Sequence, residues 1–510
     1  MHARRVRSPD EALRTLRSTD LVRDLNSMAT QPKPNLILFL PDQQRADTIA
    51  CYGGRKVHAP NLNKLASESV VFERAYVTHP VCTPSRSSLM TGTWPHINGC
   101  TRNSVPLDRR FRSFAELIDD KDYRTAYVGK WHLGDDGPAR RGFHKWISTE
   151  ERGDYTAFLL SMGVTPDLKD GAFSELTISN LPVELSRPKF LERHACEFIE
   201  KHFRDPFILV VAFVEPHSPY NGPLNVEHPL EEIDLDPTAT LPENDNIPLR
   251  YRLMREWQQA RAVLDRQRLP DQFFFGVTPD EYRSIKQRYI GLVTLVDQSI
   301  GAILGCLEQF GLTDNTIVVH TSDHGDSLGA HHLFAKEVMF EEAARVPFLI
   351  RLPGQKRSKL IPQPVSHIDF IPTLLDLLGQ FATANPSCGG PTHPQCAGKS
   401  LLPLIHDEQM PPESIFMEWA PNRTKVKKGT SLAPRRMIKR AIDEYTRTVV
   451  SSGGWKLCLR DKDLNELYNL NDDPWETRNL YTDREYASVI SRCTDEIHRW
   501  QETTNDKLSL

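Results

Sequence analysis

The stretch Asn35-Leu36-Ile37-Leu38-Phe39-Leu40, followed at once by Pro41-Asp42-Gln43-Gln44, decides the fold of this chain. A short, continuous apolar run that stops at polar residues is typical of a strand buried on both faces of a parallel sheet. In open sheets of this kind, ligands bind beyond the carboxyl ends of the strands. Asp42 and Gln43 are therefore expected at the edge of the sheet where a ligand binds.

Three later segments repeat this pattern, each an apolar run that stops at ionisable side chains. They are Tyr127-Val128 before Lys130 and His132, the run 207–214 before His217, and the run 316–321 before Asp323 and His324. Helix-like stretches separate the runs, which predicts an α/β protein with a large central sheet, mixed but mostly parallel and flanked by helices. The polar residues after all four runs should then meet on one rim of the sheet.

Between the first two of these runs lies Cys82-Thr83-Pro84-Ser85-Arg86, which predicts a nucleophile on the first turn of a helix. Thr83 suits the N-cap and Pro84 suits the first helical position. Cys82 would then face free backbone N–H groups and the positive end of the helix dipole, where an anion is stabilised. Arg86, about one turn further on, can point the same way. The alternative is a small, buried hydrophobic Cys82.

The composition is ordinary for a soluble globular protein, with 510 residues, 39% hydrophobic and 25% charged. This length allows one large domain and a smaller one. The net charge of -4 predicts neither a nucleic-acid nor a membrane partner, so a basic site for an anionic substrate must be a local cluster. We expect no membrane span, because no apolar run is long enough.

The first 30 residues are polar and Arg-rich and lack the apolar core of a secretory signal, which predicts a cytoplasmic protein. In that compartment the nine cysteines are expected to be reduced thiols. Cys388 and Cys396, in a loop rich in Pro and Gly, could instead pair or bind a metal. His331 and His332, adjacent in a Gly-rich loop, are expected on the solvated surface.

Changes in composition divide the chain into three parts. Residues 1–32 are expected to be disordered or loosely attached, and residues 33–405 to form the α/β domain. Within that domain, the Pro-rich and charged residues 219–280 predict an insertion near the rim, a candidate lid. Residues 406–510 predict a small α+β subdomain. Its antiparallel strands are expected at 414–419, 447–450 and 455–459, and its helix at about 483–504.

Asp42, Gln43, Asp323 and His324 are candidate ligands of one divalent cation. Carboxylate and amide oxygens suit hard ions such as Ca2+, and the imidazole also permits Mn2+. For any one of these residues a turn or an N-cap is an equally good explanation. Two such pairs, each at a strand end, favour the metal.

The chain resembles the sulfatase family, within the alkaline phosphatase superfamily, over roughly residues 33–480. The blocks that carry the resemblance include Ala59 to Leu62, Cys82 to Arg86, Leu89 to Gly92, Gly129 to Gly134, Pro216 to Pro219, Ser322 to Gly325, Arg345 to Pro347 and Glu466 to Leu470. The resemblance implies hydrolysis of a sulfuric ester. It also implies that Cys82 is oxidised to formylglycine, whose aldehyde hydrate is the nucleophile, and that Arg86 stabilises this hydrate.

The same resemblance implies roles for the other residues. The metal, Ca2+ foremost with Mn2+ or Mg2+ as alternatives, would be held by Asp42, Gln43, Cys82, Asp323 and His324. Lys130 and Lys336 would contact the sulfate oxygens. His217 would protonate the leaving alcohol or position the sulfate, and His132 would help to release the sulfate and restore the aldehyde. Asn103 is a further, weaker candidate for substrate binding, with a turn residue as its alternative.

The pairs Asp42-Gln43 and Asp323-His324 differ from those of many sulfatases and resemble the branch that includes choline sulfatases and phosphonate monoester hydrolases. Lys130 and His132 follow the sulfatase pattern, so the expected substrate is a small-molecule sulfate ester. A formylglycine-generating maturation enzyme is the expected protein partner. One alternative is a phosphonate monoester hydrolase or phosphodiesterase that uses the same hydrate. Another is an inactive anion-binding protein, if Cys82 is never oxidised.

Overall fold

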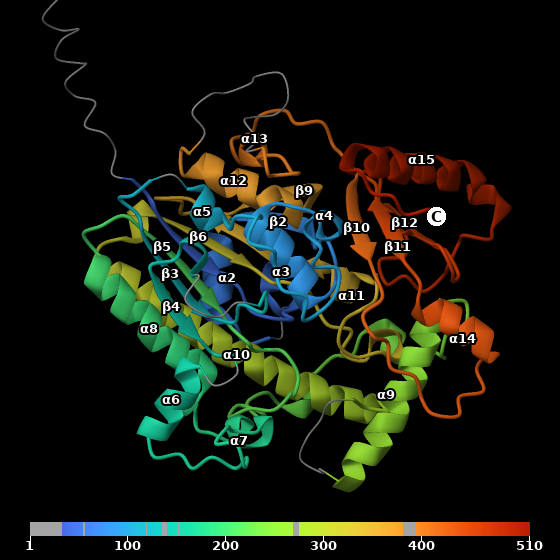
Figure 1. Ribbon diagram of the computed structural model, residues 1–510, viewed down its shortest axis with the longest axis horizontal. Coiled ribbons are helices and arrows are strands. Elements are labelled where there is room, and N and C mark those ends of the chain that lie inside the picture. The colour runs from blue at the N-terminus through green and yellow to red at the C-terminus, as the bar shows by residue number, and fades with distance from the viewer. Residues whose placement is uncertain are drawn as a thin grey trace, which may run out of the picture.

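Two β-sheets organise the chain: a large one flanked by helices, and a small one beside the C-terminal helix α15 (Ala487–Thr504) (Figure 1). The computed structural model describes residues 33–54, 57–118, 120–134, 140–150, 153–268, 275–380 and 394–510. The segment 1–32, expected to be disordered, and Cys388 lie outside the described residues. The predicted α/β class, with a small C-terminal α+β subdomain, is confirmed.

The large sheet has nine strands in the part of the chain that the structure describes. They are β1 (Asn35–Phe39), β2 (Val70–Tyr76), β3 (Arg124–Gly129), β4 (Lys145–Ser148), β5 (Phe207–Ala212), β6 (Thr316–Thr321), β7 (Arg345–Val346), β8 (Phe348–Arg351) and β9 (Lys359–Ser366). Their order is β4-β3-β5-β1-β6-β8-β2-β7, with β9 paired to β2. Because β8 is antiparallel to both β6 and β2, the sheet is mixed but mostly parallel, as predicted.

The four strands predicted from apolar runs lie side by side as β3, β5, β1 and β6, and all run parallel. Phe39, the last residue of β1, lies opposite Val211 on one side and His320 on the other. Every residue of β1 is buried, which explains its continuous apolar sequence. Because parallel neighbours end at the same edge, the polar residues that follow these strands are brought together there.

Helices cover both faces of the large sheet (Figure 1). The described helices besides α15 are α2 (Pro60–Ser67), α3 (Cys82–Thr91), α4 (Pro95–Asn98), α5 (Phe114–Leu117), α6 (Asp154–Ser161), α7 (Glu175–Ser179), α8 (Arg187–His202), α9 (Leu249–Arg268), α10 (Pro279–Gln309), α11 (Glu341–Ala344), α12 (Phe370–Leu377), α13 (Leu402–Ile405) and α14 (Arg435–Ile442). Ile37 and Phe39 pack with residues of α2, α8 and α10, whereas Leu36 and Leu38 pack with residues of α5 and α12. Successive side chains of β1 therefore point to opposite faces of the sheet and belong to the hydrophobic core on each face.

Helix α10 begins at Pro279, because Thr278 and Glu281 form a capping box at its start. By length and composition alone, it is the one described helix that could cross a membrane. Its most apolar window is 67% buried inside the protein. Its apolar residues Val296, Ile300 and Ile303 belong to the core beneath the sheet.

Helices α8 and α10 are joined by a disulfide between Cys196 and Cys306, whose Cα atoms are 6.1 Å apart. The expectation of reduced thiols throughout is wrong for this pair. Spacing along the chain could not reveal it, since 110 positions separate the two residues and only the packing of the helices brings them together. Cys396 is a free thiol.

The small sheet is antiparallel, as predicted, with the order β10 (Ile415–Trp419), β11 (Thr446–Val450), β12 (Trp455–Arg460) and β13 (Glu466–Asn469). The predicted insertion 219–280 contains α9, which is fixed to this sheet rather than loose. The buried guanidinium of Arg250 on α9 lies 2.7 Å from a Glu444 oxygen and 4.0 Å from the ring centre of Trp419. The lid role of the segment stays a prediction.

Gly129, at the end of β3, allows a test of how closely β3 and β5 pack at their ends. Its φ is +124°, and an added Cβ would collide with the backbone carbonyl of Ala212 on β5. We expect Gly129→Ala to reduce the free energy of unfolding by about 3 kcal/mol in a urea titration, since strain and collision add. Gly163 is the matched control, with φ +80° and no atom within 4 Å of an added Cβ. Gly163→Ala should lose only about 1 kcal/mol, and equal losses would contradict the collision.

Candidate active site

Cys82 is the first residue of α3, a helix buried along its whole length. Val81, in an extended conformation, is the N-cap, so the prediction that Thr83 caps the helix is wrong. The cap comes instead from a distant side chain: Oδ1 of Asn103 accepts the backbone N–H of Thr83 at 3.1 Å. The Thr83 hydroxyl donates to the carbonyl of His132 at 2.9 Å. These contacts place Asn103 and His132 around the start of α3.

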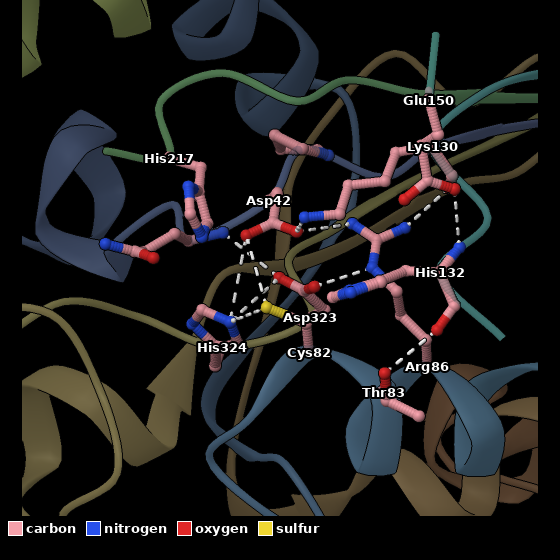
Figure 2. Close-up of polar contacts among 12 residues, drawn as sticks. Asp42, Cys82, Thr83, Arg86, Lys130, His132, Glu150, His217, Asp323 and His324 are labelled. Atoms are coloured by element: carbon pink, nitrogen blue, oxygen red, sulfur yellow. Dashed lines mark hydrogen bonds and ion pairs between the residues drawn. The ribbon is translucent and has the colours of Figure 1, made fainter. Parts of the chain in front are cut away.

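A buried network of opposite charges lies beside Cys82 (Figure 2). The guanidinium of Arg86 reaches Oδ2 of Asp323 at 2.7 Å and Oδ2 of Asp42 at 3.1 Å. The ammonium of Lys130 lies 2.7 Å from the same Asp42 oxygen. All four side chains are buried, and each comes from a different part of the chain. The edge of the sheet therefore collects the groups predicted to meet there.

The other oxygen of Asp42 and of Asp323, Oδ1, faces His324 and Cys82. His324 Nε2 lies 3.7 Å from Oδ1 of Asp42 and 3.8 Å from Oδ1 of Asp323. Cys82 Sγ lies 3.2 Å from the same nitrogen and 3.8 Å from Oδ1 of Asp42. One ligand atom from each of the four residues falls within 4.8 Å of the others, a spacing that could hold a metal ion.

Gln43 lies next to this group and is held in a left-handed conformation, with φ 70°. Its backbone N–H donates to Oδ1 of Asp323 at 3.0 Å, and its side-chain oxygen accepts from Lys336 at 2.5 Å. Lys336 also reaches Nε2 of His217 at 2.7 Å. The five residues predicted to hold a metal are thus neighbours, and Lys336 links Gln43 to His217.

The charges around the site set the ionisation of Asp42 and Cys82. Burial alone would raise the pKa of Asp42, but the positive charges of Lys130 and Arg86 outweigh it and hold this pKa well below its usual range. Burial and the Asp42 carboxylate oppose ionisation of Cys82, yet Lys336 and Lys130 outweigh them, and the pKa of the thiol is well below its ordinary value. The site therefore stabilises negative charge at position 82.

The two predicted catalytic histidines differ in their surroundings. Burial, reinforced by the Lys336 ammonium, lowers the pKa of His217, so this imidazole is neutral near pH 7. With Nε2 accepting from Lys336, its Nδ1–H donates to the carbonyl of Ser218 at 2.6 Å. His132 has a buried Nδ1 with no hydrogen-bond partner among the described residues. Glu150 accepts the backbone N–H groups of Trp131 and His132 at 2.9 and 2.8 Å.

Several residues that position the site were missed in the sequence. Asp326 accepts from the side-chain amide of Gln43 and, at 2.6 Å, from the hydroxyl of Tyr220. The hydroxyl of Tyr289 donates to the carbonyl of Gln43 at 2.7 Å. Asp326 follows Asp323 in the same polar stretch and could have been found by that signal. The tyrosines lie 177 and 246 positions from Gln43, and no local pattern marks them.

Asn422, from the C-terminal part of the chain, is another residue at the rim. Its Oδ1 accepts the backbone N–H of Asn103 at 3.0 Å, and its Nδ2 donates to Glu337 at 2.5 Å. Asn103 caps α3 beside Cys82, and Glu337 follows Lys336. The chain after β10 is thereby attached to two sides of the site.

His331 is buried, so the expectation of a solvated surface is wrong for this residue. Its ring stacks on Phe340 with centres 3.7 Å apart, and its Nε2 lies 3.8 Å from a Glu342 oxygen. His331, Glu342 and Glu476 form a second group of donors within 4.8 Å of one another. Lys456, 2.8 Å from Glu476, supplies positive charge there. The group lies behind the site, because the Glu342 carbonyl accepts the N–H of Asp326 at 2.8 Å.

Comparison with known proteins places this geometry in a family. The model of the family described as "Sulfatase" matches residues 34–380, and that of "N-sulphoglucosamine sulphohydrolase, C-terminal" matches residues 329–436. An "Ulvan-active sulfatase" of Formosa agariphila is 31% identical over 374 residues, which span 70% of this chain and 64% of that protein. A "Choline-sulfatase" of Rhizobium meliloti is 26% identical over 478 residues, 88% of this chain and 83% of that protein.

Solved structures share the fold. A phosphonate monoester hydrolase from Silicibacter pomeroyi superposes with a TM-score of 0.75 at 22% identity, covering 93% of this chain and 96% of that one. "BT4656 in complex with its substrate D-Glucosamine-2-N, 6-O-disulfate" superposes with a TM-score of 0.69 at 23% identity, covering 93% and 99%. At these identities the likeness concerns the arrangement of the chain alone.

The buried group of His331, Glu342 and Glu476 is expected to make the stability of the protein depend on pH. Burial raises the pKa of Glu342 from 4.5 to about 7. Between these values the folded protein holds a proton that the unfolded chain has lost, so Glu342 removes stability as pH rises. Glu342→Gln should therefore gain on the order of 2 kcal/mol relative to the parent at pH 8, and nothing near pH 4. Urea unfolding at several pH values measures this difference.

The matched control is the neighbouring Glu341→Gln, which removes the same charge. Glu341 pairs with Lys456 at 3.0 Å and accepts from the Tyr76 hydroxyl at 3.0 Å, so its loss should destabilise the protein. A Glu342→Gln variant that loses stability at pH 8 as the control does would contradict the assigned proton.

Proposed function

The chain belongs to the sulfatase family of sulfuric ester hydrolases, and we propose that it cleaves a sulfate monoester at the site around Cys82. One observation carries the proposal. Cys82 stands at the start of α3, in contact with His324 and Asp42 and next to the cations Arg86 and Lys130. A sulfate ester bound there would meet fixed positive charge in a site from which water is largely excluded, where electrostatic stabilisation of a transition state is strongest.

Position 82 is proposed to act as formylglycine, made from Cys82 by a maturation enzyme. Oxidation of Cys82 would supply an aldehyde whose hydrate attacks the sulfur of the ester. The surroundings favour an oxyanion at this position, because the same charges hold the pKa of the Cys82 thiol well below its ordinary value. Asn103 fixes the first turn of α3 by accepting the N–H of Thr83, which keeps residue 82 at the helix start.

The donor set of this chain fits one divalent cation. Arg86 and Lys130 engage Oδ2 of the two aspartates, which leaves Oδ1 of each to face His324 and position 82. Asp42, Asp323, His324, residue 82 and the side-chain oxygen of Gln43 would hold the ion, with Ca2+ foremost and Mn2+ or Mg2+ as alternatives. A bound cation would polarise the sulfate oxygens.

Proton transfer is assigned to the histidines. The neutral His217 receives a hydrogen bond from Lys336, so this pair can pass a proton to the leaving alcohol as the sulfur–oxygen bond breaks. His132, whose Nδ1 is buried without a partner among the described residues, is the proposed base for sulfate release. Lys130 and Lys336 are proposed to hold the sulfate oxygens.

The proposal is tested by specificity constants for matched aryl esters. We expect kcat/KM for 4-nitrophenyl sulfate to exceed that for a phenyl phosphonate monoester and for a phosphodiester by about tenfold or more. Cys82→Ala should abolish turnover of all three, because it removes the nucleophile. Intact-mass analysis of the peptide with residue 82 shows whether the thiol has been replaced. Preference for the phosphodiester, or full activity with an unmodified thiol, would contradict the proposal.

The metal assignment is tested by adding one carboxylate to the donor set. Gln43→Asp should raise the affinity for Ca2+ by about tenfold, because a charged oxygen replaces a neutral one. The measurement is the increase in melting temperature when Ca2+, Mg2+ or Mn2+ is added to chelated protein. Asn103→Asp is the control, since it adds the same charge beside Cys82 but outside the donor set. Equal effects of the two variants would contradict a ligand role for Gln43.

A further inference from the structure

One surface segment carries concentrated positive charge on a chain whose net charge is -4. Between residues 423 and 440 there are eight Lys or Arg residues and no Asp or Glu. They are Arg423, Lys425, Lys427, Lys428, Arg435, Arg436, Lys439 and Arg440, and all eight are exposed. We call residues 423–440 the basic strap. It is the kind of local cluster that an anionic ligand requires on a protein of this overall charge.

The charges of the basic strap are barely neutralised by the rest of the protein. Within the described parts of the chain, Lys427 alone has an ion pair, at 3.5 Å from Glu256 on α9. Lys425 lies 5.1 Å from the ring centre of Trp257, also on α9, as a cation–π contact. The other cations of the strap are therefore available to a ligand.

Lys439 and Arg440 lie in the last turn of α14, where the helix dipole favours cations, but the cations of the first turn oppose the stability of the helix. Arg435 and Lys439 are four residues apart, as are Arg436 and Arg440, so like charges face each other along the helix. Arg435 and Arg436 also stand at the helix N-terminus, where the dipole disfavours cations. A folding role therefore does not explain Arg435 and Arg436 at the start of α14. Positive charge kept at a cost to local stability points to a bound anion.

The basic strap begins at the rim of the proposed active site. The residue before it, Asn422, is hydrogen-bonded to Asn103 and to Glu337, which are next to the start of α3 and to Lys336. Arg423, the first residue of the basic strap, is in a left-handed conformation with φ 55°. From β10 the segment passes over α9 to α14 (Figure 1). Its cations fall in two groups, at 423–428 beside the rim and at 435–440 on α14.

We propose that the basic strap is a substrate subsite, which binds anionic groups on the part of the substrate outside the cleavage pocket. The inference rests on the proposed function and narrows it to a substrate class: an oligosaccharide that carries several sulfate groups. The scissile sulfate lies at Cys82, and further sulfates along the same chain lie against the strap. A ligand with one anionic group could not reach both places, and would leave the strap unused.

The subsite is tested with chemically sulfated maltohexaose, and with 4-nitrophenyl sulfate as the ester with a single anionic group. The variant Arg435→Ala/Arg436→Ala/Lys439→Ala/Arg440→Ala removes four charges of the strap. The matched control removes four exposed charges that precede strands and so lie at the opposite edge of the sheet: Lys121→Ala/Lys201→Ala/Arg204→Ala/Arg357→Ala. Both variants have the same net charge.

Affinity for sulfated maltohexaose is measured on the Cys82→Ala background by calorimetry, so that the ligand stays intact. We expect the strap variant to bind it about tenfold more weakly at about 0.05 M salt and to lose most of the salt dependence. The control should bind as the parent does. With Cys82 present, both variants should keep the parent kcat/KM for 4-nitrophenyl sulfate, which shows that they are folded.

The outcomes are distinguishable. Unchanged binding of sulfated maltohexaose by the strap variant, or an equal loss in the control, overturns the subsite. So does a strap variant that loses affinity for a DNA duplex or for anionic phosphatidylserine vesicles but not for sulfated maltohexaose, since the strap then serves another partner. If the parent fails to hydrolyse any sulfate ester, the proposed function fails, while the calorimetric result still decides whether the strap binds sulfated chains.

Discussion

The buried guanidinium of Arg86, between Asp42 and Asp323, is the contact on which the rest of the site depends. A charge in the interior must be paired, and here one cation pairs with carboxylates that follow two different strands. The contact attaches α3 to the ends of β1 and β6. It also determines which carboxylate oxygens face the other site residues. Because Oδ2 of each aspartate pairs with Arg86, Oδ1 of each faces Cys82 and His324. Cys82, the candidate metal ligands and the cations Arg86 and Lys130 are thus held in one arrangement.

The C-terminal part of the chain completes the site rather than merely adjoining it. Asn422 attaches its first loop to the Asn103 turn and to Glu337. Glu476 enters the buried group with His331 and Glu342, directly behind the loop that contains Asp326. Because both attachments reach residues adjacent to site residues, the small sheet and the large sheet together set the shape of the rim. The basic strap extends from one of these attachments.

The sequence predicted most of what lies along the parallel strands. Apolar runs located β1, β5 and β6, because strands buried on both faces leave that pattern, and the polar residues after them marked the edge. It failed where the partner is remote. The cap of α3 comes from Asn103, and the burial of His331 comes from stacking on Phe340. From the neighbouring residues alone, Thr83 is expected to cap α3 and His331 to lie on the surface. Contacts with distant residues decide otherwise in both cases.

By itself, the sequence determined the class of fold, the position of Cys82 at a helix start and the identity of the ionisable groups at the strand ends. Only the tertiary structure decided how these groups divide their contacts: which oxygens of Asp42 pair with Arg86 and Lys130, and that Lys336 lies between Gln43 and His217. It also decided the Cys196–Cys306 disulfide. The physical reason is that apolar periodicity is a local property of the sequence, whereas the buried charges and thiols pair with residues between 44 and 293 positions away.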